Sequence, residues 1–114
     1  MASLKISGIK EAKEALQRLK RDVAPEVLLP AIRRGGEVLR KQASSLTQSP
    51  RVQAGIHQDE GTQLGATVAT AIEAEVGGPY AAKLLEQAVD LAQDRAIQVV
   101  TREVARRIDR EVRL

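Results

Sequence analysis

The sequence contains no cysteine, no phenylalanine and no tryptophan, and Tyr80 is its single aromatic residue. Without cysteine, neither disulfides nor thiolate chemistry are available. Aromatic side chains usually supply the largest buried areas, so the core must be built from Leu, Ile, Val and Ala. Because 17 of the 114 residues are alanine, we expect a monomer of modest stability that gains from burying more surface in an assembly.

Long apolar runs are also missing. The longest are far too short to span a bilayer, and the first ten residues, MASLKISGIK, lack the apolar stretch of a signal peptide. Neither charge sign dominates, since 18 basic and 15 acidic residues give a net charge of +3. This balance is compatible with nucleic acid nearby but supports it weakly. The length fits one domain, so we expect residues 1–114 to form a single structural domain without membrane contact.

The apolar pattern predicts an α+β fold with a long broken helix. Leu4 and Ile6 alternate with polar residues and predict a short N-terminal strand. Helical spacing follows over 11–22 and again from about 26 to 46. Pro25 disfavours helix at the residue before it, which places the break near that point.

Gly35 lies inside the apolar stripe of the second helical segment. Interior glycine costs helix stability unless packing uses the space, so we expect another backbone to approach closely there. The letters RRGG around it could also bind an anion. However, no frame of strand, glycine loop and helix surrounds them, as a phosphate loop requires.

The middle of the chain predicts an antiparallel β-hairpin. Val52, Ala54 and Ile56 alternate on one face of a first strand, and residues 67–76 alternate again as a second strand. The stretch DEGTQLG between them contains two glycines and suits the hairpin loop. We expect the hairpin, about 51–76, to pack on the long helices through the apolar residues Val52, Ile56, Val68 and Ile72.

Gly77, Gly78 and Pro79 predict a structural turn into a long C-terminal helix. Glycine adopts φ values that other residues resist, and proline suits the first helical position. Tyr80 would then lie in the first turn, at the seam between sheet and helix. We expect its ring to pack on Leu84 or on the long helix and its hydroxyl edge to face a neighbouring subunit or protein.

The C-terminal helix is predicted to carry an arginine stripe. At about 100° per residue, five arginines fall within a narrow sector: Arg95, Arg102, Arg106, Arg110 and Arg113. One interpretation is a solvated face with paired charges, including the i,i+4 pairs Glu103–Arg107 and Asp109–Arg113. The other is a contact surface for phosphate or for acidic residues of a partner, because arginine binds both. The interleaved acids favour acidic protein groups over DNA.

No pattern of catalytic or metal-binding residues is present in the sequence. His57 is the only histidine and falls on the polar face of a predicted strand, so we interpret it as a solvated residue. Glu73 and Glu75 share one strand face, but nothing in the pattern buries them as paired catalytic carboxylates require. We therefore expect no enzyme activity, no catalytic residue, no metal and no cofactor.

The order of these elements resembles that of the neck or tail-completion proteins of long-tailed bacteriophages. The resemblance covers nearly the whole chain and is carried by LKISGIKEAKEAL, AIRRGGEVLRKQASSL and EVGGPYAAKLLEQ. Family members commonly have a G…YA…(V/L)E segment after the hairpin, matched here by Gly78, Tyr80, Ala81, Leu85 and Glu86. They often carry a PVDTG-type turn and an EFGT segment with prolines, where this chain has TQSPRVQAG and QAVDLAQ.

The resemblance implies a non-enzymatic virion protein that forms a homo-oligomeric ring at the head–tail junction, as a neck protein or a tail terminator. Its partners would be further copies of itself and neighbouring head-closure and tail proteins. DNA would pass through the channel without sequence-specific binding, and assembly would take place in the host cytoplasm. From the residues alone, two other functions stay open. One is a small basic nucleic-acid-binding protein that uses the arginine stripe, and the other is a helical dimerisation module.

Overall fold

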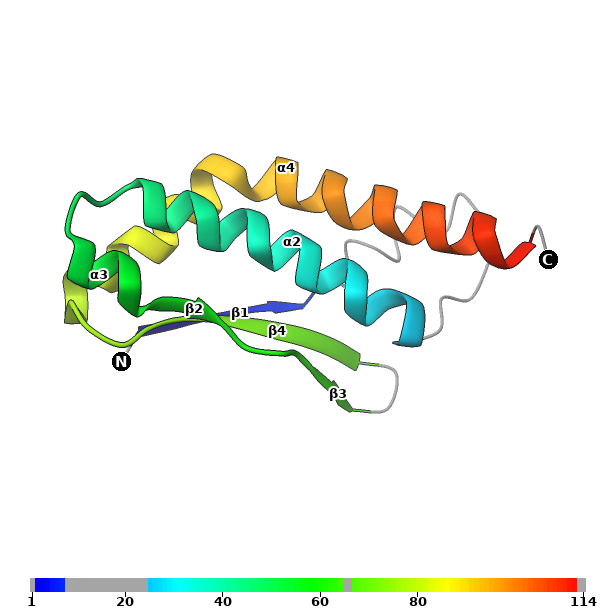
Figure 1. Ribbon diagram of the computed structural model, residues 1–114, viewed down its shortest axis with the longest axis horizontal. Coiled ribbons are helices and arrows are strands. Elements are labelled where there is room, and N and C mark those ends of the chain that lie inside the picture. The colour runs from blue at the N-terminus through cyan, green and yellow to red at the C-terminus, as the bar shows by residue number, and fades with distance from the viewer. Residues whose placement is uncertain (1, 8–24, 65–66, 113–114) are drawn as a thin grey trace.

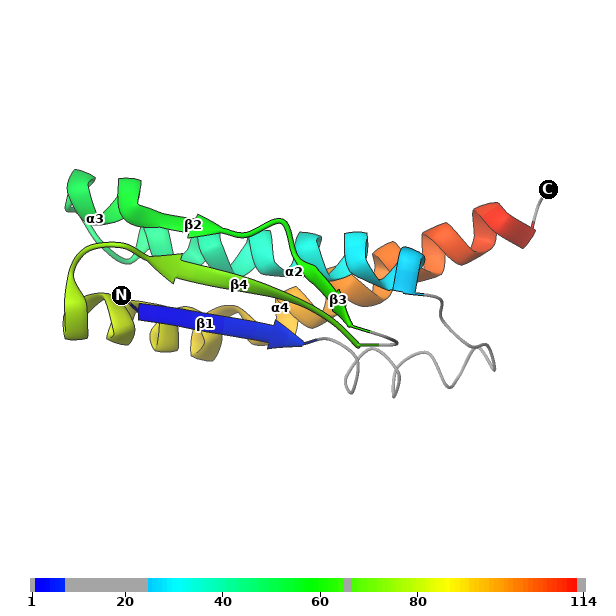
Figure 2. The same ribbon diagram turned by 90° about the horizontal axis from the view of Figure 1, so that it is seen from below.

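Two long helices lie over one face of a small antiparallel sheet (Figures 1 and 2). The computed structural model describes residues 2–7, 25–64 and 67–112. In chain order the elements are β1 (Ala2–Ser7), α2 (Pro25–Ser45), α3 (Pro50–Gly55), β2 (Ile56–Gln58), β3 (Thr62–Leu64), β4 (Thr67–Ala74) and α4 (Gly78–Val112). The predicted α+β class, N-terminal strand, hairpin and long C-terminal helix are confirmed. The helix predicted over 11–22 lies outside the described residues.

Helices α2 and α4 run antiparallel and share the most extensive interface in the fold. Helix α2 continues through Pro30, and α4 is one continuous helix of 35 residues that curves along its length (Figure 1). One line of buried residues on α4 recurs every four positions, at Leu84, Ala88, Ala92, Ala96, Val100 and Val104. Four residues exceed the helical repeat of about 3.6, so the buried line winds around the helix axis.

Strand β4 is the centre of the sheet. Strand β1 pairs with one of its sides and β2 with the other, all antiparallel, and β3 pairs with β4 beyond the end of β2. Leu4 lies opposite Ile72 in the first pair, and His57 lies opposite Glu73 in the second. Strand β4 is thus the element that ties the N-terminal strand to the hairpin.

A β-bulge interrupts the strand formed by β2 and β3. Gln58 pairs with Ile72 and Thr62 pairs with Ala69, so three residues stand opposite two and the register shifts by one. The Asp59 carboxylate accepts bonds from the backbone nitrogens of Gly61 (2.9 Å) and Ala71 (3.0 Å). The sequence prediction of a hairpin loop over DEGTQLG was therefore wrong in part, because pairing resumes after Gly61.

The stretch from Arg51 to Gly55 forms helix α3, which corrects the prediction of a strand there. The Ser49 hydroxyl accepts a bond from the Val52 nitrogen at 3.3 Å, and Pro50 follows at the first helical position. These are the residues that favour a helix start. Val52 and Ile56 are both buried while the residue between them, Ala54, is exposed, so a spacing of four explains this stretch better than alternation.

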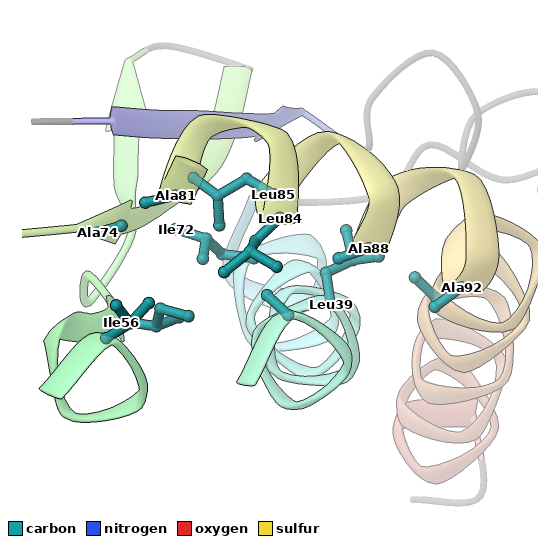
Figure 3. Packing of buried hydrophobic residues seen from close by; sticks show 12 residues of the cluster. Leu39, Ile56, Ile72, Ala74, Ala81, Leu84, Leu85, Ala88 and Ala92 are labelled. Carbon is teal, nitrogen blue, oxygen red and sulfur yellow. The ribbon is translucent and has the colours of Figure 1, made fainter. Parts of the chain in front are cut away.

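The core consists of two clusters of buried aliphatic residues under the helices. The larger one joins the start of α4 to α3 and β4, with Leu39, Ile56, Ile72, Leu84 and Leu85 at its centre (Figure 3). The smaller one joins the far end of α4 to the start of α2 and contains Val27, Leu28, Ile32, Val68, Val100 and Val104. The four hairpin residues predicted to pack on the helices, Val52, Ile56, Val68 and Ile72, are all buried.

The two glycines of RRGG each make room for a different neighbour of α2. A Cβ placed on Gly35 would lie 2.5 Å from the Val100 Cγ2 and 3.2 Å from the Ala96 carbonyl oxygen of α4. A Cβ on Gly36 would lie 2.4 Å from the Gln58 Nε2 and 2.8 Å from the Thr70 Cγ2 of the sheet. The close approach predicted at Gly35 is confirmed, and α2 is held between α4 and the sheet.

Candidate functional site

The predicted turn before α4 is built by two glycines with positive φ. Gly77 has φ of 100° and Gly78 has φ of 48°, values that other residues adopt only with strain. The Gly77 carbonyl accepts bonds from the nitrogens of Tyr80 (3.1 Å) and Ala81 (3.3 Å). The turn therefore caps the helix through its own backbone, and Pro79 falls at the second helical residue rather than the first.

Tyr80 lies on the surface at this end of the molecule, with 52% of its area exposed. Its hydroxyl donates to the Oγ1 of Thr47 at 3.0 Å, and Thr47 is buried in the connection between α2 and α3. The expectation that the hydroxyl edge faces a neighbouring subunit or protein stays a prediction, beside this bond within the same chain. The side chain thus ties the first turn of α4 to the end of α2 and leaves much of its surface uncovered.

The structure describes the side chains of three members of the arginine stripe on α4. Arg95 is exposed and donates to the Gln42 Oε1 of α2 at 3.3 Å. Arg102 is exposed and makes no hydrogen bond or ion pair within residues 2–7, 25–64 and 67–112. Arg106 contacts Glu103 at 3.0 Å. The Arg110 side chain and Arg113 lie outside the described part of the chain.

Among the acids of α4 whose side chains the structure describes, Glu103 alone is buried, with 8% of its area exposed. Its Oε1 lies 3.0 Å from Arg106 Nη2 and 3.5 Å from Arg107 Nη2, and 4.0 Å from Nε of Arg34 on α2. The i,i+4 pair with Arg107 predicted from the sequence is confirmed. A buried charge of this kind is tolerated when it is paired, and Glu103 holds two arginines of α4 and one of α2 together.

The first half of α4 carries an exposed acidic row that the sequence analysis missed. Glu86, Asp90 and Asp94 are spaced by four residues, and all three are exposed. No other side chain in the described part of the chain forms an ion pair with them. Leu91, beside this row, has 66% of its area exposed. The spacing of four along one predicted helix was the signal that could have found the row.

His57 of β2 and Glu73 of β4 lie opposite each other, and Glu75 follows just beyond the end of β4, where the predicted strand was expected to continue to Val76. The His57 Nε2 lies 3.1 Å from the Glu73 Oε2, and its Nδ1 lies 3.2 Å from the Gly55 carbonyl oxygen. The Glu75 Oε1 is more distant, 3.9 Å from the His57 Nδ1. Among the described residues, no group of three or more His, Cys, Asp or Glu side chains could hold a metal ion. We interpret this trio as a cross-strand contact of the sheet surface.

No family model, no curated protein and no solved structure matches the chain. Among the helices that the structure describes, none has the length and apolar character needed to cross a membrane.

Proposed function

We propose that this chain is a structural protein of a bacteriophage virion, a ring-forming neck or tail-completion component at the head–tail junction. The order of elements carries the proposal. A strand, a long helix, a hairpin, a glycine–proline–tyrosine turn and a final long helix follow one another. Of the segments that carry the family resemblance, residues 4–7 of the first fall on β1, the second falls on α2, and the third covers the turn into α4.

A non-enzymatic role fits the chemistry of the described side chains. The single histidine bonds to a carbonyl oxygen and to Glu73 at the sheet surface. The buried acid, Glu103, is surrounded by arginines. Both arrangements are those of side chains that stabilise a fold or a contact surface. The proposed partners are further copies of the chain, neighbouring head-closure and tail proteins, and DNA that passes without sequence-specific binding.

The proposal is tested by removing the gene from the phage that carries it and examining the particles by electron microscopy. We expect filled or closed heads and separate tails that fail to join, and joining restored by the full chain supplied from a plasmid. The protein should also be detected at the head–tail junction of intact virions. Normal joined particles in the absence of the chain would contradict the proposal.

The alternative is a small nucleic-acid-binding protein, and the observation that favours it is the exposure of Arg95, Arg102 and Arg106 along one helix. Contacts to phosphates release counterions, so affinity would fall steeply with salt. Tight DNA binding at physiological salt that is lost in R95A/R102A/R106A would favour this function. The buried Glu103 beside Arg106 opposes it, because it offsets part of the positive charge.

A further inference from the structure

Helix α4 exposes two charged faces of opposite sign, one after the other. The acidic face consists of Glu86, Asp90 and Asp94, preceded on the same side of the helix by the single base Lys83. The arginine face consists of Arg95, Arg102 and Arg106, and all of these residues are exposed. Leu91 falls between the two faces, and among the side chains that the structure describes it is the more exposed of two large hydrophobic residues on the surface.

The internal stability of the helix does not explain this arrangement. Like charges four residues apart destabilise a helix, and the acidic face stacks them twice, while Arg102 and Arg106 do so again. The helix dipole favours acids at the start and bases at the end, but only within the first and last turn. Glu86 already lies in the third turn of α4, which begins at Gly78.

The acidic face also has no partner within the described part of the chain. Glu86, Asp90 and Asp94 form no ion pair there, and Arg102 forms none either. These charges are therefore available to a partner with the complementary charge.

The two faces point in different directions. At about 100° per residue, their centres differ by roughly 140° around the helix. One neighbour cannot cover both faces at once, so a contact that pairs one with the other joins two different patches. Such a heterologous contact adds copies in sequence and closes into a ring when the rotation between copies allows it.

We propose that α4 docks onto α4 of a second copy of this chain, with the acidic face of one copy against the arginine face of the next and Leu91 buried between them. The inference rests on the proposed function only in that the contact repeats around a ring. The occupant is a second copy because the chain itself presents both complementary surfaces.

The test uses the full chain and two charge-reversed variants, E86K/D90K/D94K and R95E/R102E/R106E. Size-exclusion chromatography with light scattering measures their mass at low and high salt, and circular dichroism checks their fold. We expect the wild-type chain to assemble at low salt. Each variant alone should need at least a tenfold higher protein concentration to reach the same degree of assembly. An equimolar mixture of the two variants should assemble again, because each then supplies the charge that the other needs.

Two further variants keep the test specific. R51E reverses an exposed charge on α3 and should assemble like the wild type, whereas L91S should weaken assembly without changing the thermal midpoint. If R106E disturbs the fold through its contact with Glu103, R95E/R102E replaces the triple variant, because Arg95 and Arg102 do not touch Glu103.

The outcomes separate this contact from the proposed function. Wild-type assembly that all variants retain would overturn the contact and leave the ring standing. A wild-type chain that stays monomeric at low salt would overturn the contact, while the head–tail joining experiment would still decide the function. DNA binding by a monomeric chain that is lost in R95E/R102E would overturn the contact in favour of a nucleic-acid surface.

Discussion

The two ends of the interface between α2 and α4 are held together in different ways. At the start of α4, Leu84 and Leu85 pack among Leu39, Ile56 and Ile72, and the Tyr80 hydroxyl bonds to Thr47. At the far end, Gly35 brings the two backbones close beside Val100, and Glu103 gathers three arginines. The larger aliphatic cluster fills the first end, whereas the second end combines a smaller aliphatic cluster with close backbone approach and a paired buried charge.

The difference shows how a chain with one aromatic residue can hold two long helices together. Where the sheet lies beneath both helices, branched side chains from α2, β2, β4 and α4 pack together (Figure 3). Where α4 extends along α2, Gly35 lets the α4 backbone at Ala96 approach closely, so dispersion contacts between the two helices add to the smaller aliphatic cluster. Substitutions that change one end only should therefore separate these two kinds of contact.

The largest effect is expected for Ile72→Ala, at the aliphatic end. Ile72 is fully buried, and truncation of a buried isoleucine typically costs about 2–5 kcal/mol of unfolding free energy. Urea unfolding of the full chain measures the loss. Leu91→Ala, at an exposed position on α4, is the matched control and should change the value by less than about 0.5 kcal/mol. A loss no larger than that of the control would mean that this cluster does not carry the fold.

At the far end, Gly35→Ala should destabilise the chain by about 1–3 kcal/mol, because the added methyl overlaps the Val100 Cγ2 and approaches the Ala96 carbonyl oxygen. Val100→Ala removes one of these obstacles. The double variant should therefore lose less than the sum of the two single variants, which a double-mutant cycle detects. Strict additivity would show that the two helices separate freely at this point.

Glu103→Gln should cost about 1–2 kcal/mol, because three guanidinium groups lose their shared carboxylate. The control is Glu37→Gln, which removes an exposed i,i+4 pair with Lys41 and should cost no more than about 0.5 kcal/mol. Thermal unfolding of both variants measures the difference. Equal losses would mean that burial adds nothing to the Glu103 cluster.

The smallest effect is expected for Tyr80→Phe, which removes only the hydroxyl bond to Thr47 and should cost about 0.5–1 kcal/mol. In a Thr47→Val background the same change should have no further effect. Tyr80→Ala should lose less than the roughly 3–5 kcal/mol typical of buried aromatic truncation, because half of the side chain is exposed. A larger loss would place Tyr80 in the core.

Most elements of the fold could be predicted because their patterns are long. The stripe of α2 and the alternation of β4 each continue over several repeats, and Gly77 and Gly78 mark a turn that few other residues can adopt. The stretch Val52 to Ile56 is too short for this, since spacings of two and four both fit it. In this stretch the Ser49 cap and Pro50 favour the helix over the strand.

The candidate site was only partly predictable for a different reason. The arginine stripe follows from helix geometry, but the contacts that α4 makes with α2 depend on which part of α2 lies beside it. Arg34 meets Glu103, and Gln42 meets Arg95, across more than fifty residues of sequence. No local pattern contains that information, because it is fixed by the antiparallel packing of α2 and α4.

The bulge at Asp59–Gly61 has a consequence for any assembly made of many copies. An exposed, regular edge strand offers its free backbone groups to a strand of another molecule and so seeds extended sheets. The extra residue and the Asp59 carboxylate break the regular spacing along β2 and β3, and Gln58 and Arg33 bond this region to α2 and to the Glu60 carbonyl. That side of the sheet is therefore protected against aggregation by strand addition when copies are crowded together.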